Sequence, residues 1–150
     1  MPSRRSLDIV AVALACLTGC GRAIPFQTVD QGLYSGCRQA EQTVVRTQEE
    51  WEALWQRHVE WLSPRPDRPV IDFTQSMVLA VFLGERPTGG YSVSISAVKQ
   101  RGRALEVQVE ERPPNPGDMV LQATTTPYHL VRLRRSEVPV RFRVRAVRSD

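Results

Sequence analysis

The sequence predicts an α+β domain: a mainly antiparallel sheet with one amphipathic helix, about residues 48–61, packed on it. Three observations lead to this class. One segment has apolar residues at helical spacing, and several later segments alternate apolar and polar residues with the period of a strand. The third is the uninterrupted apolar run 77–83, which has the length of a central strand covered on both faces. A helix followed by consecutive strands is typical of α+β domains.

The N-terminus has the parts of a secretion signal in their usual order. Arg4 and Arg5 precede the apolar run 9–17, which small residues follow. This run is too short to cross a bilayer, because a spanning helix needs roughly 20 apolar residues. We therefore expect the signal to be removed. Cys20 directly follows Leu-Thr-Gly, and this sequence resembles the lipobox of bacterial lipoproteins, in which the thiol is acylated.

This signal sets the expected organisation of the chain. Residues 1–19 are predicted to be a lipoprotein signal peptide, and residues 20–33, which show no clear period, a lipid-anchored tether. The folded domain is predicted over 34–150. Lipid on Cys20 would hold the protein on a membrane of the cell envelope, the outer membrane where the host has one. The alternative is an ordinary secreted protein with a coincidental cysteine.

The predicted helix has a clear start and a clear end. Thr47 and Glu50 form a T-x-x-E capping box, which satisfies exposed backbone donors in the first turn. The apolar stripe that follows comprises Trp51, Leu54, Trp55, His58, Val59 and Leu62. Three prolines in residues 63–69 cannot continue the helix. His58 shares the face of the two tryptophans, so we expect it to be packed rather than to bind a ligand.

Strands account for most of the remaining pattern. A short strand is expected at 41–46, before the helix. The later strands are expected at 77–83, 91–96, 105–110, 121–125, 128–133 and 140–147. His129 follows Tyr128 in a strand and therefore points to the opposite face, where a solvent-exposed position is expected.

Composition excludes several classes of function. The chain has 20 basic and 16 acidic side chains, a net charge of +4 that does not indicate a nucleic-acid partner. Cys37 is the only cysteine outside the signal and the lipobox, so no internal disulfide is available to the domain. Burial as a small apolar residue is favoured for it over pairing with another chain. Neither of the two histidines lies in a metal-binding spacing, and no metal or cofactor is predicted.

A longer block carries a family resemblance. Residues 79–95 contain Phe-Leu-Gly-Glu-Arg-Pro-Thr-Gly-Gly-Tyr, which resembles the signature of the PrcB C-terminal family, named for an accessory subunit of a secreted bacterial protease complex. The Trp51–Trp55–His58 pattern and the Thr-Pro-Tyr of residues 126–128 also fit, and the resemblance spans roughly 34–143. It implies an exported, often lipid-anchored domain that supports a protease partner by binding and has no catalytic residues.

The loop 86–91 inside this block has two interpretations. Pro87 and the Gly89–Gly90 pair suit a tight reversal between strands, which needs no further function. The loop is also longer than the shortest hairpin requires, and its side chains suit a binding surface. The predicted partner contacts are Arg86, Thr88, Gly89, Gly90, Tyr91 and Tyr128. Binding is favoured if the proline-marked loops 113–118 and 124–128 lie at the same end of the sheet.

Two other functions remain open. The loop 86–91 is also similar to the Asn-Pro-Thr-Thr-Gly loop of chagasin-type inhibitors of papain-like proteases, although Arg86 replaces the asparagine and Gly89 the second threonine. Inhibition of a protease is therefore the alternative function. A small enzyme is less favoured: no catalytic motif is present, and the spacing of Asp72, Glu85 and Asp118 does not indicate that they converge.

Overall fold

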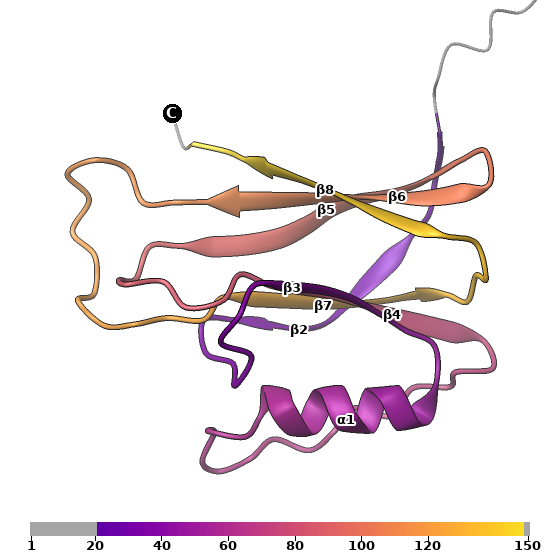
Figure 1. Ribbon diagram of the computed structural model, residues 1–150, viewed down its shortest axis with the longest axis horizontal. Coiled ribbons are helices and arrows are strands. Elements are labelled where there is room, and N and C mark those ends of the chain that lie inside the picture. The colour runs from indigo at the N-terminus through magenta and orange to yellow at the C-terminus, as the bar shows by residue number, and fades with distance from the viewer. Residues whose placement is uncertain (1–20, 149–150) are drawn as a thin grey trace, which may run out of the picture.

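The computed structural model describes residues 21–148, which form two packed sheets with a helix on the outer face of one (Figure 1). The elements are β1 Arg22–Ala23, β2 Phe26–Gly32, β3 Glu41–Val45, α1 Gln48–His58, β4 Ser76–Phe82, β5 Ser92–Arg101, β6 Ala104–Arg112, β7 Tyr128–Arg134 and β8 Val140–Ala146. The sheets have the strand orders β1-β5-β6-β8 and β2-β7-β4-β3. Only the β6–β8 pair is parallel among these strands. The predicted α+β class is confirmed, although the strands form two sheets instead of one.

The central strand β4 packs against both α1 and the second sheet and so joins the three layers of the molecule. It lies between β7 and β3, and every residue from Met77 to Phe82 is buried. Alternate side chains, beginning with Val78, face α1, whereas those beginning with Met77 face the second sheet. Because neither face meets water over residues 77–82, this part of the strand contains no polar residue. The uninterrupted apolar run therefore predicted its central place correctly.

The capping box at the start of α1 is confirmed. The Glu50 N–H donates to Thr47 Oγ1 at 3.2 Å, and the Arg46 and Thr47 N–H groups donate to the Glu50 carboxylate at 2.8 and 3.1 Å. These hydrogen bonds hold the pKa of Glu50 below its usual value. The helix ends at His58, three residues before the predicted end, and its buried face comprises Trp51, Leu54, Trp55 and His58.

The predicted tether 20–33 is wrong over its described part. Residues 22–23 pair with β5, and β2 pairs with β7 along its length. A register shift between Thr28 and Asp30 breaks the alternation of β2, so its sequence lacks the period of a strand. Partly buried Phe26 and Val29 pack against the two cores. The predicted signal peptide 1–19 and Cys20 lie outside the described residues.

Two strand-level predictions near β7 also need correction. Residues 121–125 are not a strand: Thr125 makes an isolated bridge to Arg86, and Leu121 is exposed. His129 is buried instead of solvent-exposed, because β7 is an inner strand with both faces covered. The Ile95 N–H donates to His129 Nδ1 at 2.8 Å, and Nε2 lies 2.9 Å from Thr28 Oγ1. This pattern places the ring proton on Nε2, and burial lowers the pKa of His129, so the ring is neutral.

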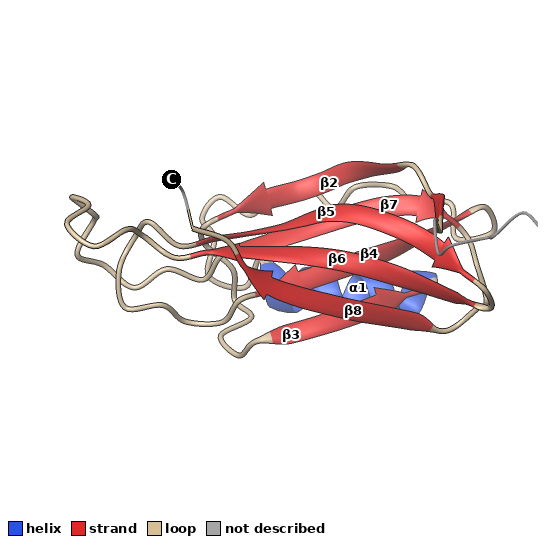
Figure 2. Ribbon diagram, turned by 90° about the horizontal axis from the view of Figure 1, so that it is seen from above, coloured by secondary structure: helices blue, strands red, loops and turns tan. Residues whose placement is uncertain are grey.

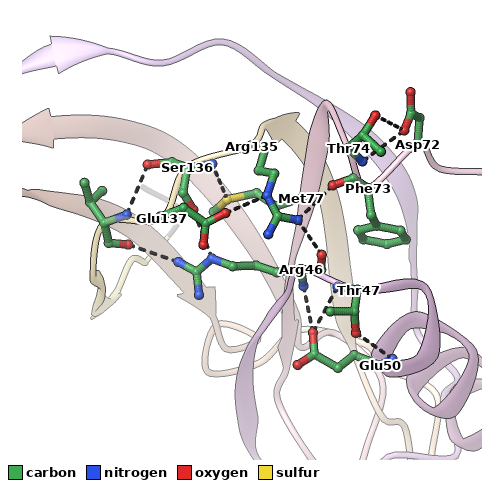
Figure 3. A network of polar contacts seen from close by, with 11 residues as sticks. Arg46, Thr47, Glu50, Asp72, Phe73, Thr74, Met77, Arg135, Ser136 and Glu137 are labelled. Atoms are coloured by element: carbon green, nitrogen blue, oxygen red, sulfur yellow. Dashed lines mark hydrogen bonds and ion pairs between the residues drawn. The ribbon is translucent and has the colours of Figure 1, made fainter.

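A polar network fastens one end of the molecule (Figure 3). Arg135 Nη1 donates to the carbonyls of Arg46 and Phe73 at 2.6 and 2.8 Å. Arg46 in turn donates to the carbonyls of Ser136 and Val138 at 2.9 and 3.0 Å. The junction of β3 with α1 is thereby joined to the turn between β7 and β8. The network thus fixes the ends of several elements to one another at this end of the molecule.

Candidate functional site

Three loops meet at the end of the molecule away from this network, on the left of Figure 1. They are residues 33–40, 83–91 and 113–127, and we call their combined surface, together with the adjoining side chain of Trp61, the loop end. The second and third loops are hydrogen-bonded to each other. Arg86 and Thr125 exchange two backbone hydrogen bonds of 2.8 and 2.9 Å, and the Gly89 N–H donates to the Leu121 carbonyl at 2.8 Å. The Thr125 hydroxyl also donates to the Thr88 carbonyl at 2.9 Å.

The first loop is attached to both of the others. The Glu85 N–H donates to the Arg38 carbonyl at 2.9 Å, and the two side chains form an ion pair at 3.2 Å. The Ser35 N–H donates to Thr126 Oγ1 at 2.7 Å, and this hydroxyl donates to the Ser35 carbonyl at 2.9 Å. The proline-marked loops therefore lie at the same end as residues 86–91. This was the condition under which the sequence favoured a binding surface.

The structure divides the predicted contact residues into exposed and structural ones. Arg86 and Tyr91 are partly exposed, with the guanidinium carbon of Arg86 5.9 Å from the ring centroid of Tyr91. Thr88 is also partly exposed, but Gly89 is buried. Gly90 has φ +84°, and a Cβ there would lie 2.8 Å from Pro114 and Val120 side-chain atoms, so glycine is required for the turn.

Tyr128 does not belong to the predicted contact surface. Its side chain is only 6% exposed and packs in the core between α1 and the sheet. The ring meets that of His58 edge-on at 4.3 Å between centroids. Burial and the adjacent Asp30 carboxylate, to which the hydroxyl is hydrogen-bonded, raise the pKa of Tyr128. Its role is to support the loop end from inside.

The structure adds exposed apolar side chains that the sequence did not single out. Tyr34 and Trp61 are 49% and 67% exposed, and they line a groove of about 320 Å³ together with Arg38. The guanidinium carbon of Arg38 lies 5.4 Å from the centroid of the Trp61 ring. Met119 and Leu121, on the longest of the three loops, are also exposed. Trp61 lies off the apolar stripe that the sequence predicts for the helix. An apolar residue outside this stripe was the sequence signal that could have identified an exposed position.

A buried polar cluster supports this groove. His58 Nδ1 lies 2.9 Å from Ser35 Oγ, and Nε2 lies 3.1 Å from the Asp30 carboxylate. His58 is fully buried, as its place on the tryptophan face predicted. The cluster connects β2, the first loop and the end of α1. His58 is more than 20 residues from the other two members, which fall in or next to the segment that was predicted to be a tether.

These three residues are the types found in a hydrolytic Ser-His-Asp relay, but their surroundings indicate a structural role. The Cys37 N–H donates to Ser35 Oγ at 3.1 Å, and the Gly36 N–H donates to the His58 carbonyl at 2.8 Å. The two N–H groups that follow the serine are thus already used, whereas an oxyanion formed there would need free donors. Ser35 is also buried. The cluster holds the first loop on the helix.

The positions of the other candidate residues show which of them lie close together. Asp72 accepts from the Thr74 N–H in the region drawn in Figure 3, whereas Glu85 pairs with Arg38 at the loop end, so Asp72 does not converge with Glu85. Cys37 is buried and unpaired, as favoured, and burial raises the pKa of its thiol. Within residues 21–148, no group of three His, Cys, Asp or Glu side chains is placed to hold a metal ion. The one helix in this part of the chain, α1, does not meet the length and hydropathy needed to cross a bilayer.

Comparison with known protein families gives a match. The family model described as PrcB C-terminal matches residues 77–134. This segment runs from β4 to β7 and includes the second and third loops of the loop end, but not α1 or β8. It is shorter than the resemblance noted over 34–143. No curated protein and no solved structure matches the chain significantly.

Proposed function

Because residues 77–134 match the PrcB C-terminal family, we propose that this chain is a non-catalytic accessory domain that binds an exported protease and stabilises or positions it. The observation that supports this most directly is the loop end. Three loops are hydrogen-bonded into one surface that presents Tyr34 and Met119 to solvent, and the exposed Trp61, which follows α1, adjoins it. Aromatic side chains and arginine concentrate binding energy at protein interfaces.

The proposed function includes an anchor on Cys20 in the cell envelope. Arg22 begins β1, which pairs with Gln100 and Lys99 at the far end of β5. The loop 83–91 leads into the opposite end of the same strand at Ser92. A lipid on Cys20 would therefore lie at the end of the sandwich away from the loops, and the loop end would face a partner instead of the membrane.

The anchor gives a direct prediction. We expect the wild-type chain to incorporate radiolabelled palmitate and to sediment with membranes, and the Cys20→Ala variant to lose both properties because no thiol remains for acylation. Cys37→Ala is the matched control, and it is expected to label like the wild type. Equal labelling of wild type and Cys20→Ala would contradict the anchor while leaving partner binding open.

The loop end gives a second prediction. Affinity purification of the tagged protein from its own envelope is expected to recover a protease, and the double variant Tyr34→Ala/Trp61→Ala is expected to bind it at least about 30-fold more weakly, as the loss of an aromatic hot spot does. Stability is expected to change by less than about 1 kcal/mol, because both side chains are largely exposed.

Val70→Ala provides the control for this experiment, because Val70 is 96% exposed and lies outside the three loops. It is expected to bind like the wild type. Equal binding by the double variant would show that the loop end is not the interface. Assaying the recovered protease with and without the domain then separates the two functions: a longer lifetime or higher activity supports the accessory role, whereas loss of activity indicates an inhibitor.

A further inference from the structure

Strand β8 leaves one edge of its sheet open. It is the last strand in the order β1-β5-β6-β8, and no described strand pairs with its outer side. Figure 2 shows β8 along a margin of the sandwich. Its register with β6 has no shift from Val140 to Ala146. This regular edge is a template for another strand.

The backbone hydrogen bonds show which groups face the open side. The Leu105 N–H donates to the Pro139 carbonyl at 2.9 Å, and the Val147 N–H donates to the Glu111 carbonyl at 2.8 Å. Residues 139 and 147 therefore direct their backbone groups to β6. Because these directions alternate along an unbroken strand, Phe142 and Val144 direct N–H and C=O to the open edge.

The side chains of β8 differ between its two faces. Arg141, Arg143 and Arg145 are exposed on the outer face, whereas Phe142 packs into the core between the sheets. Val144, on the same side as Phe142, is 44% exposed. A strand added here would thus have a row of arginines beside one of its faces and an incompletely covered apolar row beside the other.

The arginines retain positive charge after their internal pairing. Glu106 is shared by Arg101 at 3.5 Å and Arg143 at 3.9 Å, and Glu110 is likewise shared by Arg112 and Arg145. Arg141 makes no ion pair with any residue in the described part of the chain. A second copy of β8 added in antiparallel fashion would bring this arginine row beside itself, which is unfavourable. The charge thus selects against self-association and for an acidic strand.

We propose that β8 binds an extended segment of another protein that alternates acidic and apolar residues, by adding it as a fifth strand. The acidic side chains lie beside the arginine row, and the apolar ones cover Val144. Main-chain hydrogen bonds supply affinity in this mode, and alternate side chains supply specificity. This inference goes beyond the proposed function, because β8 lies outside both the loop end and the segment matched by the family model.

The test uses the purified full-length protein and two labelled seven-residue peptides with blocked ends, one alternating valine with glutamate and one alternating valine with lysine. The glutamate peptide is expected to bind saturably, at least about 10-fold more tightly than the lysine peptide, and to slow hydrogen exchange at the Phe142 and Val144 amides. No binding, equal binding of the two peptides, or binding without protection of these amides would overturn the proposal.

A proline variant tests the edge itself. Val144→Pro removes an N–H that points to the open side, so it leaves the hydrogen bonds to β6 intact, and edge strands tolerate proline in this position. It is expected to weaken the glutamate peptide at least about 10-fold, whereas Val144→Thr binds like the wild type. Wild-type affinity in the proline variant would contradict strand addition.

A charge reversal gives an independent measurement, should Val144→Pro not fold. Arg141→Glu is expected to reduce binding of the glutamate peptide and to increase binding of the lysine peptide. An unchanged preference would exclude the arginine row as the source of specificity. Neither experiment uses a protease. A negative result with the peptides therefore does not contradict protease binding by the loop end, and failure to recover a protease does not contradict strand addition at β8.

Discussion

Replacing Trp51 with alanine is expected to lower the free energy of unfolding by about 3–5 kcal/mol, the range for truncating a buried aromatic side chain. Trp51 is fully buried in the core between α1 and the sheet. Its ring lies 5.4 Å from that of Trp55, and its Nε1 donates to the Pro69 carbonyl at 3.0 Å. The substitution would leave a cavity and an unpaired carbonyl. Because domains are stable by only about 5–15 kcal/mol, this loss is a large share of the total.

Trp61→Ala is the matched control, because the same side chain is removed from a site that is 67% exposed. We expect its stability to stay within about 1 kcal/mol of the wild type. Urea unfolding monitored by far-UV circular dichroism measures both variants without relying on tryptophan fluorescence. Similar losses in the two variants would contradict the placement of α1 against the sheet. The two variants also distinguish a tryptophan that stabilises the fold from one that is proposed to bind a partner.

Replacing His58 with alanine is expected to cost about 2–4 kcal/mol, from lost packing and from hydrogen-bonding groups left without a partner. The ring is fully buried and contacts the rings of Trp55 and Tyr128 edge-on. Its nitrogens lie next to Ser35 and Asp30. Ser35→Ala removes only one of these contacts, so it is expected to cost less. We expect His58→Ala also to loosen the first loop, measured as faster hydrogen exchange at residues 33–40.

The cost of His58→Ala is expected to depend on pH through Asp30. Burial raises the pKa of this carboxyl, but the hydrogen bond and charge of His58, together with hydrogen bonds from Tyr128 and the Gln31 N–H, more than offset burial, so the pKa lies below its ordinary value. A carboxyl whose pKa is lowered in the folded state stabilises the fold at pH values above its unfolded pKa of about 3.9. This stabilisation is lost as the pH falls through the folded pKa. Without His58, Asp30 loses that hydrogen bond and that charge, so the effect of burial in raising its pKa meets less opposition.

Urea unfolding at about pH 5 and about pH 3 checks this expectation, because these values lie on either side of an ordinary aspartate pKa. The difference in stability between wild type and His58→Ala is expected to shrink at the lower pH. In an Asp30→Asn background, the effect of His58→Ala is expected to lose this pH dependence. A difference between wild type and His58→Ala that grows on acidification would contradict the Asp30–His58 pairing.

The sequence predicted those parts of the fold whose signals are local. The capping box at Thr47 and Glu50 marked the start of α1, and the continuous burial of residues 77–82 followed from their composition. The missed strand β2 shows the limit of such signals. Its register shift near Asp30 breaks the alternation, and pairing with β7, about a hundred residues later, stabilises it. Long-range pairing of this kind leaves little trace in a local pattern.

The sequence indicated where the candidate site lies better than it indicated which residues form it. The glycine-rich loop 83–91 does lie with the other proline-marked loops at one end, and Gly90 has the left-handed backbone that was expected. Tyr128 was misassigned because its loop neighbours suggested exposure, whereas the inner position of β7 buries it. The groove beside Tyr34 and Trp61 depends on the packing of the first loop against α1, which no single segment encodes.

The central strand β4 has a further consequence for the unfolded chain. Residues 77–83 contain no charge, proline or glycine, and segments of this kind readily form intermolecular cross-β aggregates when exposed. In the folded domain β7 and β3 flank the strand, while α1 and the second sheet cover its faces. β7 joins β4 only after about 45 further residues have been added to the chain. Solubility before folding therefore depends on shielding this segment until β7 is available.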